Sequence, residues 1–83
     1  MKFDLFSRVA LTVDMPKYHL KRGDVATIVE QIEAGPNSGP GYALEVFNAI
    51  GETAAVLLVT EFEIEPLRED ELLQVRHFEP ELQ

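Results

Sequence analysis

Few side chains in this sequence could support catalysis as a nucleophile or a general base. The histidines are His19 and His77, the serines are Ser7 and Ser38, and cysteine is absent. A catalytic triad needs a nucleophile, a base and an orienting group within hydrogen-bonding reach of one another. Neither serine has the sequence context of a strained strand-to-helix turn that exposes a nucleophile. The sequence therefore predicts a protein that is not an enzyme.

Carboxylates are abundant late in the chain, and their spacing indicates a solvated surface. They include Glu61, Glu63, Glu65, Glu69, Asp70 and Glu71. The first three alternate, so in a strand they would share one solvent-facing side. Acid–base catalysis would need one carboxyl of a pair in an apolar pocket that raises its pKa. A calcium site would need several oxygens converging on one point. We therefore expect no cofactor and no dedicated metal site.

Five residues are candidates for binding a partner. Tyr18, His19, Lys21 and Arg22 lie close together in a basic stretch, which could hold an anion or an acidic surface. Tyr42 adds a ring with a polar tip, the kind of side chain that lines half-wet binding grooves. Each has a structural alternative, because the cations and the histidine could be exposed turn residues and the tyrosines could pack in the core.

Charge is divided unevenly along the chain. The net charge is −8, yet residues 1–22 hold five of the seven Lys and Arg against two acids. The acidic excess makes nucleic acid an unfavourable partner, because phosphate contacts supply most of that affinity. It favours a basic protein as the partner. Two alternatives stay open: an RNA- or ribosome-associated protein that uses the basic segment with Arg8 and Lys17, and a structural or self-associating subunit.

Features of composition predict a soluble cytoplasmic protein with no membrane contact. The longest apolar run, Ala54–Val59, is far shorter than the ~20 residues that cross a bilayer. Met1–Asp4 does not open a run of signal-peptide length. The absence of cysteine fits a reducing compartment.

Alternating apolar residues and turn residues predict a domain made of strands. The expected strands are 9–13, 25–32, 42–47, 53–60 and 72–76. Between the last two, alternation over Glu61–Glu65 would turn Phe62 and Ile64 inward. Gly23 and Gly51 are expected in turns with positive φ. We expect one domain over residues 1–76, with a loop at 35–41 and a polar tail at 77–83.

Five short strands without a helical apolar period predict a small barrel or sandwich. The stretch Leu20–Glu30 resembles the opening of many SH3-like barrels, where a Gly-Asp turn leads into a valine-rich strand. The fold class expected is therefore all-β, a small SH3-like barrel of about five antiparallel strands.

More narrowly, the chain resembles the bacterial domain of unknown function 4926 family. The matching features are Val9–Leu11, Leu20–Val25, Tyr42–Phe47, Gly51–Thr53 and Leu73–Arg76. The resemblance implies an SH3-like fold without an established activity, in proteins associated with toxin-like partners. We expect a non-enzymatic protein-interaction module, an antitoxin- or immunity-type partner of a basic protein.

Overall fold

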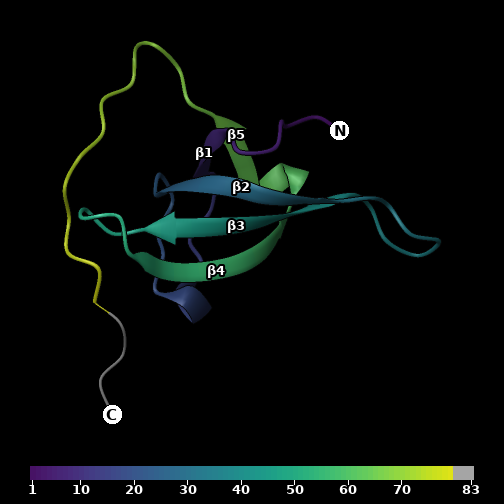
Figure 1. Ribbon diagram of the computed structural model, residues 1–83, viewed down its shortest axis with the longest axis horizontal. Helices are drawn as coiled ribbons and strands as arrows, with labels where there is room; N and C mark the ends of the chain where they lie inside the picture. The colour runs from purple at the N-terminus through teal and green to yellow at the C-terminus, as the bar shows by residue number, and fades with distance from the viewer. Residues whose placement is uncertain (80–83) are drawn as a thin grey trace.

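A computed structural model describes residues 1–79 as one five-stranded antiparallel sheet with two short 3-10 helices and no α-helix (Figure 1). The all-β fold with five antiparallel strands agrees with the prediction. The elements, in chain order, are β1 (Arg8–Leu11), η1 (Pro16–Tyr18), β2 (Val25–Ile32), β3 (Gly41–Phe47), β4 (Thr53–Thr60), η2 (Glu61–Glu63) and β5 (Ile64–Pro66). In the described residues, no helix is long and apolar enough to cross a membrane.

The strand order in the sheet is β4-β3-β2-β1-β5. β2 lies in the middle, and it carries apolar residues on both of its faces, as is typical of a central strand. β1 pairs with β2 on one side, with Val9 opposite Ala26, and with β5 on the other, with Val9 opposite Pro66. β1 and β5, the first and last strands along the chain, therefore lie side by side.

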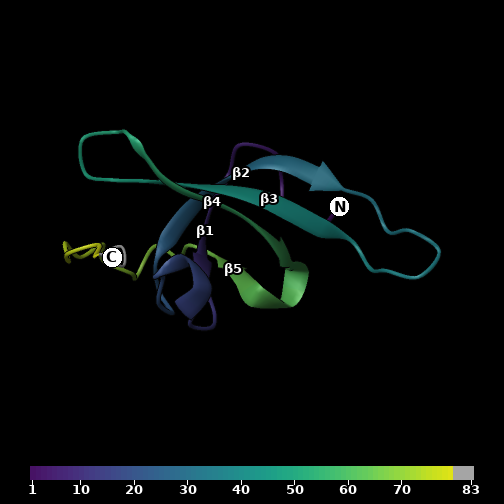
Figure 2. The ribbon, with the colours of Figure 1, turned by 90° about the horizontal axis from the view of Figure 1, so that it is seen from below.

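The sheet must curl, because β4 and β5 lie at opposite edges and only η2 joins them. Four strand intervals in a flat sheet would separate these edges by roughly 19 Å. The four residue-to-residue steps from Thr60 to Ile64 span at most about 14 Å when extended, and a helical turn is shorter. The edges approach each other at this corner (Figure 2). This curvature is consistent with the predicted small barrel.

The core fills the concave side of the curled sheet. Its largest fully buried side chains are Tyr42, Leu11, Ile28, Leu44 and Val9. Phe3 joins them from the segment before β1, with its ring edge-on to Tyr42 at a centroid distance of 5.5 Å. The Phe3 N–H donates to the Tyr42 hydroxyl at 3.0 Å. Each such apolar side chain contributes about 1.5–3 kcal/mol when removed from water.

The two turn glycines adopt the expected conformation. Gly23 has φ of 92° and Gly51 has φ of 87°, a region that other residues enter only at a cost. The predicted loop at 35–41 connects β2 to β3, which begins at Gly41. Figure 1 shows it extending beyond the body of the domain.

The predicted last strand at residues 72–76 is wrong. The fifth strand is β5, and residues 67–79 contain no regular secondary structure. The prediction that Phe62 faces inward is also wrong, since its side chain is 80% exposed. Thr60 and Glu63 form a reciprocal capping box that starts η2, and this helical turn breaks the alternation. Ile64 is buried, as expected.

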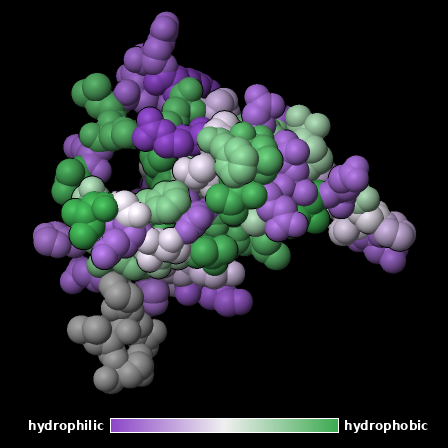
Figure 3. All heavy atoms as spheres, viewed as in Figure 1, coloured by the Kyte–Doolittle hydropathy of each residue, from purple (hydrophilic) through white to green (hydrophobic). Residues whose placement is uncertain are grey.

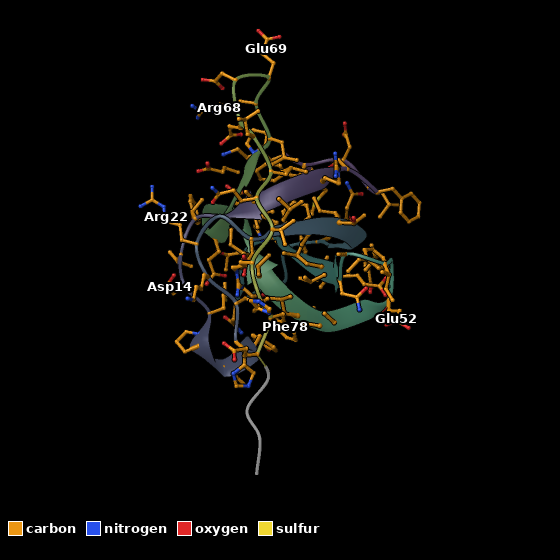
Figure 4. All side chains as sticks on the ribbon, turned by 90° about the vertical axis from the view of Figure 1, so that its left-hand side faces the viewer. Asp14, Arg22, Glu52, Arg68, Glu69 and Phe78 are labelled. Carbon is orange, nitrogen blue, oxygen red and sulfur yellow. The ribbon has the colours of Figure 1, made fainter. Side chains whose placement is uncertain are left out.

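The start of the predicted tail at 77–83 is packed against the domain. Phe78 is half-buried and contacts the core cluster. Its side chain lies against the body of the domain in Figure 4. Residues 80–83 lie outside the described part of the chain.

Candidate functional site

The loop between β1 and β2 carries four of the five candidate binding residues. Met15 and Leu20 form an antiparallel bridge across it, and η1 lies between them. His19 ends η1 in the left-handed conformation, with φ of 61°. Leu20 is buried and anchors the loop to the core. The loop is therefore a compact structure that Leu20 anchors from inside, with Met15 and Tyr18 also packed against the core.

Two aspartates shape the end of this loop. Asp14 Oδ1 accepts the Arg22 N–H at 2.9 Å, and Asp24 Oδ2 accepts the Lys21 N–H at 2.7 Å. The second bond closes the Gly-Asp turn, because the Asp24 side chain holds a backbone amide three residues before it. Lys21 and Arg22 are both exposed, and the Arg22 side chain projects into solvent in Figure 4.

The five predicted binding residues do not form one site. Tyr18 is half-buried and packs on the core, with Lys17 Nζ 5.7 Å from its ring centroid. His19 is half-buried beside it. Tyr42 is completely buried, so it is a core residue and cannot line a partner-binding surface. The reason is its position on β3, where its ring faces the concave side of the sheet.

The basic segment meets acidic residues of the later chain. A shallow hollow of about 350 Å³ is lined by Arg22 together with Glu65 and Glu71. The opposite charges of the two parts of the sequence are thus mixed on this surface. Proteins that follow a nucleic-acid backbone do so with an extended basic groove. Here Glu65 and Glu71 lie beside Arg22 and interrupt such a surface.

The segment at residues 67–79 arches past one end of the sheet (Figure 1). Arg76 attaches it through an ion pair with Asp24, in which Nε donates to Oδ1 at 2.9 Å and a terminal nitrogen pairs with Oδ2. The hydrogen bond and the charge of Asp24 raise the pKa of the Arg76 guanidinium above its ordinary value. Phe78, which packs against the core cluster, attaches the same segment at a second point.

A large open hollow of about 1030 Å³ lies between this segment and the sheet. Its lining includes Ala26, Val46, Ala54, Val75 and Phe78. In Figure 3 the surface is hollowed beside the segment. Val75 is 96% exposed although it borders the hollow, so the segment touches the domain at few points.

A second exposed apolar surface follows β4, where the described residues show pairing on one side only, with β3. Val56 is 59% exposed and Leu58 is 66% exposed. The register sets Leu58 in a row with Ala43 and Glu30, and Val56 in a row with Glu45 and Thr27. We call Val56, Leu58 and the unpaired backbone of β4 the β4 edge.

The β4 edge is uncharged along its length and acidic at its ends. All eight residues from Thr53 to Thr60 are uncharged, and Glu52 and Glu61 flank them. Sequence reasoning found the apolar run but treated it as an ordinary strand. The available signal was a long apolar strand without lysine or proline, the residues that usually protect an edge. Its position at the edge depended on the strand order.

Among residues 1–79 there is no group of three or more His, Cys, Asp or Glu side chains placed to hold a metal ion. The carboxylates that border the β4 edge are spread along it. Glu45 accepts a hydrogen bond from the Thr53 hydroxyl, and Glu52 accepts one from Asn48 at 3.1 Å.

These features define the class of the protein as a small all-β domain built on one curled antiparallel sheet. Within that class, residues 5–66 match the family described as a domain of unknown function, DUF4926, and the chain belongs to this family. The match ends at the last residue of β5. Comparisons with curated proteins and with solved structures found no match.

Proposed function

We propose that this domain is a non-enzymatic protein-interaction module that binds a basic protein. The observation that carries the proposal is the exposed apolar pair Val56 and Leu58, bordered on the same face by Glu45 and Glu30. Apolar side chains provide contact area that gains free energy on burial. Neighbouring carboxylates favour a cationic partner and disfavour an anionic one.

One concrete form of this function is neutralisation of a basic toxin or nuclease in the cytoplasm. The net charge of −8 supports attraction to such a partner over long range. The absence of cysteine suits a reducing compartment. RNA binding has less support, because Arg22 shares its surroundings with Glu65 and Glu71.

Affinity capture from a nuclease-treated extract of the source organism tests the proposal. We expect a basic protein in stoichiometric amount that raised salt releases, since exposed charge pairs weaken with ionic strength. A variant with Glu30→Gln, Glu45→Gln and Glu52→Gln should retain less of it. A matched variant with Glu69→Gln, Asp70→Asn and Glu79→Gln has the same net charge and should retain it. Recovery of no stoichiometric protein, or of RNA alone from a parallel extract without nuclease, would contradict the proposal.

A further inference from the structure

We propose that the basic partner binds by adding one extended strand to the β4 edge. This inference rests on the proposed function and specifies its geometry. An exposed edge offers a row of unpaired N–H and C=O groups that another chain can complete. β4 presents eight residues, about 27 Å of strand. Its pairing register with β3 is unbroken from Ala55 to Thr60, so this stretch of the edge is regular.

The side chains on the outer face indicate the pattern of the added strand. Val56 and Leu58 are two residues apart and point to the same side. A residue directly opposite either one would lie about 5 Å away between Cβ atoms. The added strand should therefore carry apolar residues at two alternate positions in its centre, where they would cover this exposed pair.

The charges at the ends indicate what flanks that apolar centre. Glu52 precedes β4 and Glu61 follows it. Glu45, in the row of Val56, adds a third carboxylate that a long cationic side chain could approach. Lysine or arginine near both ends of the added strand would meet these carboxylates. The edge thus fits a segment with an apolar centre and basic ends.

The same charges disfavour a second copy of this chain as the occupant. Antiparallel pairing of two β4 strands brings the beginning of each strand beside the end of the other. Glu52 of one copy would then lie near Glu61 of the other at both ends of the pair. Like charges placed this way are destabilising, and each copy also carries a net charge of −8.

A synthetic probe of about ten residues, with alternating valine and threonine in the centre and lysine at both ends, tests the inference with the whole domain. We expect it to bind, and to bind at least tenfold more weakly when the lysines are replaced by glutamates. Two further probes carry N-methyl groups on alternate backbone amides, one for each edge of the strand. One of these two should lose at least tenfold in affinity, because it cannot donate to β4.

Protein variants locate the site. Val56→Lys combined with Leu58→Lys should reduce probe binding at least tenfold. Ile50→Lys is the matched control, since Ile50 is exposed in the loop just before β4, and it should leave binding nearly unchanged. Mass determination by light scattering reports whether the domain is a monomer, as we expect.

Three results would overturn the inference. Equal affinity for both N-methylated probes and the parent would show attraction to the acidic surface without strand pairing, and the proposed function would survive. A dimer that the double lysine variant dissociates would assign the edge to a second copy. Failure of the lysine probe to bind would also exclude strand addition, whereas the proposed function is judged separately by capture of the basic protein.

Discussion

Arg76 forms a two-point ion pair with Asp24, the aspartate that closes the turn before β2. One carboxylate thereby holds two parts of the chain. Its Oδ2 accepts the Lys21 N–H within the turn, and both oxygens contact the guanidinium from the C-terminal segment. Paired contacts of this kind fix orientation as well as distance.

Replacing Arg76 and Asp24 should have unequal effects. Arg76→Ala removes a partly exposed ion pair and should lower the free energy of unfolding by at most about 1 kcal/mol. Asp24→Ala removes the ion pair and also the acceptor for Lys21, so it should cost about 1 kcal/mol more. Urea denaturation followed by circular dichroism measures both. Equal losses would mean that the turn does not depend on Asp24.

The Arg76 ion pair should hold the C-terminal segment equally well at neutral and at alkaline pH. The Asp24 hydrogen bond raises the pKa of this guanidinium above its ordinary value. A group with a raised pKa contributes stability that is present below its unfolded pKa and lost only as the pH rises through the folded value. Limited proteolysis of the segment should therefore give one rate across this range. A rate that rises steadily from neutral pH would contradict the assignment.

Tyr42→Phe should destabilise the domain although it keeps the ring. The substitution removes the hydroxyl that accepts the buried Phe3 N–H. An unpaired buried donor costs about 1–3 kcal/mol. Tyr18→Phe is the matched control at the half-buried tyrosine of the β1–β2 loop and should cost less. Thermal and urea unfolding of the two variants provide the comparison, and equal stability of Tyr42→Phe and the wild type would argue against the bond.

Gly23→Ala should be costly for conformational reasons alone. At Gly23, φ is 92° and an added Cβ would meet no atom within 4 Å. The expected loss of about 1–2 kcal/mol therefore comes from the left-handed backbone. Gly39→Ala is the control, because an added Cβ there also meets nothing and no positive φ is required. The difference in unfolding midpoint between the two variants measures the conformational cost.

Most of the fold follows from local pattern. The strands β2, β3 and β4 and the positive φ of Gly23 and Gly51 were each readable from neighbouring residues. β5 was missed because it is three residues long and its pairing partner, β1, lies at the other end of the chain. The Thr60–Glu63 capping box was a readable signal for the helical turn before β5, and it would have corrected the placement of Phe62.

The candidate site was less predictable than the fold. A tyrosine can line a groove or fill a core. For Tyr42, the choice between them depends on which face of β3 it points to. Val56 and Leu58 belong to a continuous apolar run, a pattern that is typical of a buried strand. They are exposed because they point to the outer face of β4, which the described residues leave uncovered, whereas Leu57 and Val59 point to the core.

The pairing of β1 with β5 also constrains when the domain can assemble. β1 gains its second neighbour only after the chain has been made as far as Pro66. During synthesis, the β-hairpins of β2, β3 and β4 can form first, because their partners are close in sequence. Closing the long loop between β1 and β5 carries an entropic cost that local hairpins avoid. We therefore expect a nascent chain that stops before β5 to remain open along β1, and the complete sheet to form as a late, slow step.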